Sequence, residues 1–167
     1  MTARKVMLLG EIGVGKSSLV KRLVFDRFEA DYKPTLGVDV YRYEIPPGKD
    51  HAAITLIIWD TDGNFGEAMF RHVYMKEASA AFIIGDVTRR PTLDTMLRLS
   101  QGFREHFPGR YEALIVNKLD LVEGEPLNLP DALLPNRSGV FHTSALTGDN
   151  VQLAFHEAAL TILRRRL

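Results

Sequence analysis

Short apolar runs alternate with longer amphipathic segments along the chain. Six apolar runs predict strands, at residues 5–10, 38–45, 52–59, 79–86, 112–117 and 139–144. Several of these runs are apolar throughout, which is typical of parallel strands covered on both faces. The link PPGKDH between the second and third runs is short and rich in turn residues, so it predicts an antiparallel hairpin.

Apolar residues recur at helical spacing in three segments, residues 16–25, 93–107 and 151–165, and we interpret these faces as core packing. The alternation predicts an α/β fold: a doubly wound, mostly parallel six-stranded sheet with one antiparallel edge hairpin and helices on both faces. A length of 167 residues without internal repeats predicts one domain over residues 1–167. Three prolines between residues 123 and 139 restrict any helix there to one or two turns around 131–134.

Ligands of doubly wound sheets bind beyond the carboxyl ends of the strands. In this chain the predicted strands are followed by GEIGVGKSS, WDTDGN, DVT, NKLD and TSALTGD, all of which contain polar or glycine residues. We therefore expect the functional residues at these strand ends.

The first strand end, residues 10–17, matches the pattern GxxxxGK followed by Ser, between an apolar strand and an amphipathic helix. Glycines let backbone N–H groups converge on phosphate oxygens, and the helix N-terminus adds its dipole. Lys16 would reach the outer phosphates and Ser17 would bind Mg²⁺. The loop predicts a site for a nucleoside di- or triphosphate, contacted by Gly13, Val14, Gly15, Lys16, Ser17 and Ser18.

The tetrapeptide NKLD, residues 117–120, ends another apolar strand and indicates which base is bound. One carboxylate, that of Asp120, can accept hydrogen bonds from both N1–H and N2–H₂ of guanine. Asn117 either contacts N7 of the base or ties loops together, and the stem of Lys118 can lie over the ring. A P-loop ATPase or kinase is disfavoured, because Asp120 would mismatch the edge of adenine.

With YKPTLGVD, WDTDGN and TSA, these motifs occur in the order and close to the spacing of the Ras-like small GTPases. The chain resembles the Ras and Rab branches of that family over nearly its whole length. The resemblance implies a P-loop NTPase G domain that binds GTP or GDP with Mg²⁺. It also implies that Phe28 packs against the guanine edge and that the loop of Ser144, Ala145 and Leu146 contacts the base.

The resemblance implies two segments that respond to the nucleotide, switch I (YKPTLG, residues 32–37) and switch II (WDTDGN, residues 59–64). In switch I, Tyr32 would close over the phosphates, and Thr35 would complete the Mg²⁺ shell and meet the γ-phosphate. In switch II, Asp60 would hold Mg²⁺ through water and the N–H of Gly63 would contact the γ-phosphate. The residues expected to act in catalysis are Lys16, Thr35, Gly63 and Asn64.

Three residues depart from the pattern of the family. Ile12 stands where a glycine or another small residue is usual, and would crowd the attacking water and an arginine finger. Asn64 replaces a glutamine and is one methylene shorter, while Asp62 replaces an alanine and brings a carboxylate near the γ-phosphate. We expect slow hydrolysis and intact nucleotide binding, unless Asp62 positions water differently or a partner supplies catalytic groups.

Two functions therefore stay open. The first is a GTPase switch, recognised at switches I and II by effectors, exchange factors and GTPase-activating proteins. The alternative is a non-hydrolysing guanine-nucleotide-binding scaffold or regulatory subunit. Ile12, Asp62 and Asn64 favour the alternative, whereas Lys16 and the Mg²⁺ ligands favour the switch.

Charge and cysteine content narrow the expected partners. Basic and acidic residues number 21 each, so no basic field indicates nucleic acid. The sequence has no cysteine for a prenyl or palmitoyl group, and residue 2 is Thr2 and not the glycine needed for myristoylation. No apolar stretch reaches the about 20 residues that span a bilayer. We expect a cytoplasmic protein without a lipid anchor, monomeric when alone, as would fit a prokaryotic or otherwise soluble member.

Overall fold

Strands and helices alternate along the chain in the computed structural model, which describes residues 2–31, 33–71 and 73–167. The strands are β1 (Thr2–Leu9), β2 (Val38–Ile45), β3 (Ile54–Thr61), β4 (Ala80–Asp86), β5 (Tyr111–Asn117) and β6 (Val140–His142). The α-helices are α1 (Lys16–Phe25), α2 (Arg90–His106) and α3 (Val151–Arg165). Short 3-10 helices are η1 (Gly63–Arg71), η2 (Val73–Met75), η3 (Leu119–Val122) and η4 (Asp131–Leu133).

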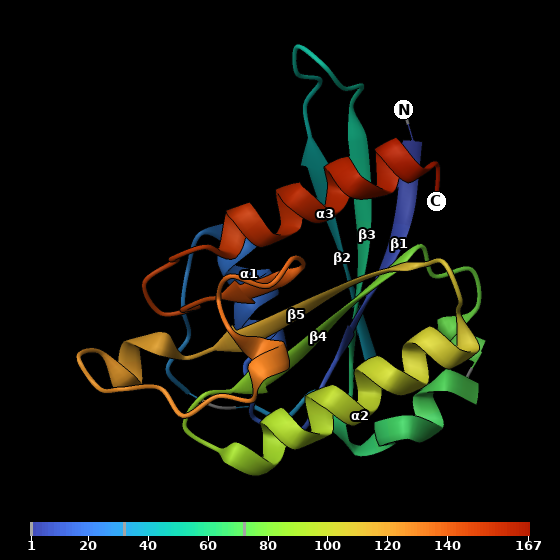
Figure 1. Cartoon of the computed structure of the whole chain (residues 1–167). Helices are drawn as coiled ribbons and strands as arrows, with labels where there is room; N and C mark the ends of the chain where they lie inside the picture. Colours follow the sequence, from blue (N-terminus) through green and yellow to red (C-terminus); the bar gives the residue numbers. More distant parts are fainter. Residues whose placement is uncertain (1, 32, 72) are drawn as a thin grey trace.

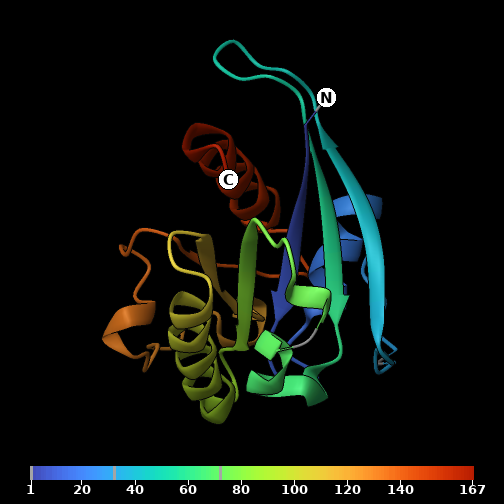
Figure 2. The ribbon, with the colours of Figure 1, turned by 90° about the vertical axis from the view of Figure 1, so that its right-hand side faces the viewer.

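The strands form one sheet in the order β2-β3-β1-β4-β5-β6. Only β2 and β3 pair antiparallel, from Val38 opposite Thr61 to Ile45 opposite Ile54, and the other neighbours are parallel. The loop of this hairpin projects beyond the rest of the molecule (Figure 2). The predicted sheet, with its antiparallel edge hairpin, is confirmed.

Helices cover both faces of the sheet, with α1 and α3 on one side and α2 and η1 on the other (Figure 1). Alternate residues of β1 supply the two cores: Val6 and Leu8 pack toward α1 and α3, whereas Met7 and Leu9 pack toward α2. This two-sided burial explains why the central strands are apolar throughout.

Several element boundaries differ from the prediction, and strand pairing lengthens β1 and β3. β1 begins at Thr2, where it pairs with Ile54, and β3 continues to Thr61, so Asp60 lies within a strand opposite Leu8 and Asp39. α2 begins three residues earlier than predicted, with Pro91 in its first turn, a position that needs no backbone N–H.

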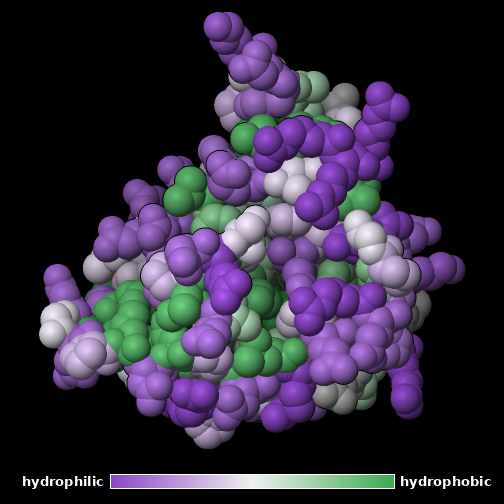
Figure 3. Space-filling view, in the orientation of Figure 1, coloured by the Kyte–Doolittle hydropathy of each residue, from purple (hydrophilic) through white to green (hydrophobic). Residues whose placement is uncertain are grey.

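The proline-rich segment before β6 forms a single short turn, η4, as predicted. Apolar residues gather on the surface near η3 and η4 (Figure 3), where Leu121 and Leu127 are exposed. In the part of the chain that the structure describes, no helix has the length and apolar character needed to cross a membrane.

Candidate functional site

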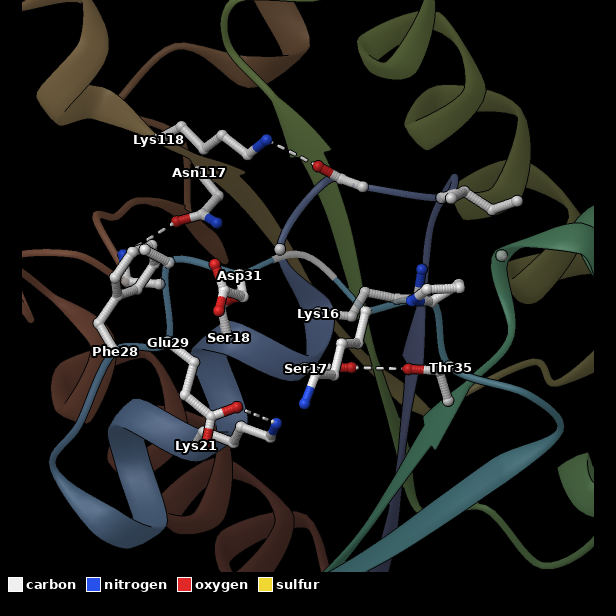
Figure 4. Close-up of a pocket in the computed structure, with 18 of the residues that line it drawn as sticks. Lys16, Ser17, Ser18, Lys21, Phe28, Glu29, Asp31, Thr35, Asn117 and Lys118 are labelled. Atoms are coloured by element: carbon white, nitrogen blue, oxygen red, sulfur yellow. Dashed lines mark hydrogen bonds and ion pairs between the residues drawn. The ribbon is translucent and has the colours of Figure 1, made fainter.

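A cavity of about 410 Å³ opens where the loops after β1, β3 and β5 meet. Its size lies in the range typical of small-molecule sites. Figure 4 shows Asn117 and Lys118 on one side of the cavity and Ser17 facing Thr35 on the other. The predicted site residues that line it are Gly13, Gly15, Lys16, Ser17, Ser18, Phe28, Thr35, Gly63, Asn64, Asn117, Lys118, Asp120, Ala145 and Leu146.

Glycine is required at two positions where the loop after β1 and other parts of the site approach each other closely. Gly15 has φ +102° and precedes α1, and a Cβ there would lie 2.3 Å from Nδ2 of Asn117. Gly63 approaches from switch II, where a Cβ would lie 2.4 Å from the backbone nitrogen of Ile12. Switch II therefore rests directly on the backbone of the phosphate loop.

Lys16 is buried beneath this loop, with 7% of its surface exposed. Its Nζ donates to the carbonyl oxygens of Gly10 at 2.9 Å and Glu11 at 3.0 Å. Burial lowers the pKa of Lys16 to about 8, against the raising effect of Asp60 and Asp62. Among the described residues no anion bonds the ammonium group directly, and a phosphate would supply one.

Three oxygen-bearing side chains meet at the start of α1. Ser17 Oγ lies 2.8 Å from Thr35 Oγ1 and donates to Oδ2 of Asp60. Asp60 is fully buried, and among the described residues its Oδ1 has no hydrogen-bond partner. Burial raises the pKa of Asp60 to about 6, in spite of Ser17 and Lys16, which lower it.

This donor set fits a hard divalent cation. Mg²⁺ is usually held by one or two carboxylates together with oxygen ligands from water and a substrate phosphate. Among the side chains that the structure describes, no group of three or more His, Cys, Asp or Glu residues is suited to hold a metal. The three oxygen-bearing side chains leave further positions of an octahedral Mg²⁺ shell open to water or to a phosphate.

The other end of the cavity is organised by Asn117 and Asp120. Asn117 Nδ2 donates to the Val14 carbonyl at 3.1 Å, and its Oδ1 accepts from Thr143 Oγ1 at 3.0 Å and from the N–H of Ala145 at 3.3 Å. Two roles were predicted for Asn117, and these contacts match the second, in which its side chain ties loops together. Ser144 Oγ donates to Asp120 Oδ1 at 2.6 Å and so orients this carboxylate.

The three unusual residues lie together at the switch II end. Ile12, Asp62 and Asn64 all line the cavity, and Ile12 is 41% exposed. The backbone N–H of Asn64 donates to Asp62 Oδ1 at 2.9 Å, which forms a local Asx turn. The backbone N–H of Asp62 donates to the Gly37 carbonyl at 2.9 Å, so switch II is bonded to the end of switch I.

The Ras family model matches residues 5–164, which is nearly the whole chain. The chain belongs to the Ras family of small GTPases. It is 33% identical over 155 residues to "Ras-related protein RABA4a" of Arabidopsis thaliana, covering 90% of this chain and 68% of that protein. It is also 34% identical over 164 residues to "Ras-related protein YPT3" of Nicotiana plumbaginifolia, covering 96% and 74%. A third relative, "GTP-binding protein ypt3" of Schizosaccharomyces pombe, is 30% identical over 164 residues, covering 96% and 76%.

Some predicted site residues of this Ras family protein do not line the cavity. Val14 and Ser144 are buried beside it, and Asp60 lies behind Ser17. Tyr32 falls outside the described residues. The nucleotide contacts, the catalytic roles, the single-domain extent and the monomeric state stay predictions.

Sequence reasoning missed four residues of this small GTPase that the fold brings to the site. Lys21 Nζ of α1 pairs with Glu29 Oε2 at 2.8 Å across the cavity wall (Figure 4). Arg89, which follows β4, donates to the Ile12 carbonyl of the phosphate loop and to Asp86, the last residue of β4. The strand-end segment DVT drew attention to the residues around Asp86. No local sequence pattern predicts the pair of Lys21 and Glu29 or the pair of Asp86 and Arg89.

Proposed function

We propose that this small GTPase is a molecular switch that binds GTP and GDP with Mg²⁺ and hydrolyses GTP slowly. The observation that carries the proposal is the oxygen cluster of Ser17, Thr35 and Asp60, which adjoins the cavity that Asp120 also lines. A phosphate loop alone would suit many nucleotides, whereas a carboxylate at the opposite end favours guanine.

The cluster supports a specific assignment for Mg²⁺. Ser17 and Thr35 would supply hydroxyl ligands, and Asp60 would hold the ion through water, which would give its partnerless Oδ1 a hydrogen bond. When bound, the ion would neutralise negative charge on the phosphates during transfer.

The residues of the chain would respond to the triphosphate in a defined way. Lys16 would exchange the carbonyls of Gly10 and Glu11 for phosphate oxygens. The backbone N–H groups of Thr35 and Gly63 would donate to the γ-phosphate and hold switches I and II. Loss of that phosphate would release both segments, so effectors, exchange factors and GTPase-activating proteins would distinguish the two states there.

In the reaction, a water oxygen attacks the γ-phosphorus and the bond from phosphorus to the GDP oxygen breaks. One proton of the water stays on the inorganic phosphate, the other passes to solvent, and GDP and phosphate leave. The backbone of Ile12 lies against Gly63 and Ile12 lines the cavity, while Asp62 Oδ1 accepts the backbone N–H of Asn64. An apolar Ile12 side chain and an engaged Asp62 carboxylate do not replace the usual glutamine. These contacts support slow turnover. They also support the second candidate, a guanine-nucleotide-binding module that does not hydrolyse GTP.

The decisive experiment loads the purified protein with GTP and Mg²⁺, removes free nucleotide and follows bound GTP and GDP by chromatography over hours. We expect slow conversion to GDP. Ile12→Gly and Asn64→Gln should accelerate it about 10- to 100-fold, because small errors in positioning cost rates of that size. GDP dissociation, measured in parallel, should stay unchanged in both variants. Retention of GTP by the wild type and both variants would favour the non-hydrolysing module, and no guanine-nucleotide binding would refute both functions.

A further inference from the structure

Arg89 contacts the phosphate loop from outside the cavity. It lies between β4 and α2, and its Nη2 donates to the carbonyl oxygen of Ile12 at 2.9 Å. Its Nε pairs with Asp86 Oδ2 at 3.1 Å. A Cβ on Gly13 would lie 3.4 Å from Nη2, so the guanidinium group packs against the loop at residues 12 and 13.

Asp86 fixes the position of this arginine. Its side chain is 2% exposed, and its Oδ1 accepts from the backbone N–H of Thr88 at 2.9 Å and from the hydroxyl of Thr88 at 2.6 Å. Lys118 Nζ lies 2.8 Å from Oδ2, the oxygen that Arg89 also contacts. Burial alone raises the pKa of Asp86, but hydrogen bonds from Lys118 and Thr88 outweigh it and lower the pKa. The carboxylate therefore stays charged and holds both cations against the loop.

Three consecutive loop carbonyls are each bonded by one side chain. The Ile12 oxygen accepts from Arg89 at 2.9 Å, the Gly13 oxygen from Lys118 at 2.7 Å and the Val14 oxygen from Asn117 at 3.1 Å. In a planar trans peptide the C=O group and the following N–H group point in opposite directions. Fixing these carbonyls therefore fixes the N–H groups of residues 13, 14 and 15 on the opposite side, as an anion-binding nest requires.

We propose that Arg89 is a positioning residue for the outer phosphates of the nucleotide, because it sets the direction of the Gly13 N–H through the Ile12 carbonyl. This inference rests on the proposed function. Gly63 of switch II lies against the backbone of Glu11 and Ile12, so the peptide between Ile12 and Gly13 is next to the switch II end of the cavity. A triphosphate places its additional phosphate at that end. Arg89 consequently matters more for GTP than for GDP.

The test compares Arg89→Ala, Arg89→Lys and the matched control Arg90→Ala. Arg90 is the adjacent arginine, and its contacts are Asp94 at 3.4 Å and the Asn128 carbonyl at 3.3 Å, away from the loop. Dissociation of fluorescent GDP and of a fluorescent non-hydrolysable GTP analogue is measured by stopped flow in Mg²⁺. Thermal unfolding of each variant reports on stability.

In Arg89→Ala, dissociation of the GTP analogue should accelerate about tenfold more than that of GDP, as expected for the loss of one hydrogen bond from a charged donor. Arg89→Lys, which keeps a cation for Asp86 or the carbonyl, should fall between Arg89→Ala and the wild type. Arg90→Ala should match the wild type. Equal acceleration for both nucleotides, with or without lower stability, would overturn the inference, as would no change. Failure of the wild type to bind either nucleotide would instead overturn the proposed function together with this inference.

Discussion

The burial of Asp60 predicts how the unfolding free energy of the protein depends on pH, independently of catalysis. Its carboxylate is buried without a cationic hydrogen-bond partner among the described residues, and burial raises its pKa from 3.8 to about 6. A difference of about two pKa units corresponds to about 3 kcal/mol that the ionised form costs the folded state. Well below pH 3.8 the group is protonated in both states and the cost is absent. The cost grows as the pH rises through the two pKa values and is complete above about pH 7.

The variant Asp60→Asn removes this titration while it keeps the shape of the side chain. Its amide leaves a buried N–H₂ group without a fixed partner, which costs about 1 to 3 kcal/mol at every pH. The pH dependence is therefore the informative quantity. Relative to the variant, the wild type should lose about 2 kcal/mol of unfolding free energy between pH 4.5 and pH 7.5.

Urea unfolding of the nucleotide-free proteins, in EDTA and at several pH values, measures this difference. Groups common to both proteins cancel in the comparison. Asp86→Asn is the control of opposite sign, because the pKa of Asp86 is lowered and its contribution to stability is lost as the pH falls. A stability difference between wild type and Asp60→Asn that stays constant from pH 4.5 to 7.5 would refute the argument that burial governs Asp60.

Two further predictions concern the cavity wall and the core. Because Lys21 and Glu29 are partly exposed, Lys21→Ala and Glu29→Ala should each raise GDP dissociation less than about fivefold, and the double variant should resemble each single one; additive effects in stopped flow would argue against their pairing. Phe155 is fully buried against Phe82, with ring centroids 4.4 Å apart, so Phe155→Ala should lower the unfolding free energy by about 3 to 5 kcal/mol. The exposed Phe25→Ala should change it by less than about 1 kcal/mol, and equal losses in urea titrations would contradict the assignment of the core.

The parts of the site that follow from local sequence could be predicted. The strand before Gly10 and the helix after Lys16 are visible in the spacing of apolar residues, and the loop between them has fixed length and composition. NKLD is found in the same way, because β5 ends directly before Lys118. Each of these motifs needs only its own segment to form.

The contacts between segments could not be predicted in the same way. Arg89 meets Ile12 only because β1 and β4 are neighbours in the sheet, which places the two strand ends side by side. The role of Asn117 was open in the sequence, since the carbonyl of Val14 is 103 residues away along the chain. The Asx turn of Asp62 is local, but the resemblance to the family drew attention to its charge and not to its hydrogen bond.

The two pKa shifts at the site connect folding to ligand binding. Lys16 and Asp60 are both buried, yet Lys16 donates to carbonyls and Asp60 accepts from Ser17. Within the part of the chain that the structure describes, neither charge has a charged hydrogen-bond partner. Burial lowers the pKa of Lys16 to about 8 and raises the pKa of Asp60 to about 6, and both shifts favour the neutral form of the group. A protein interior disfavours such groups unless they are paired. A phosphate beside Lys16 and a divalent cation beside Asp60 would supply the two missing charges together, so binding of a nucleotide with its cation should stabilise the folded chain more than either component alone.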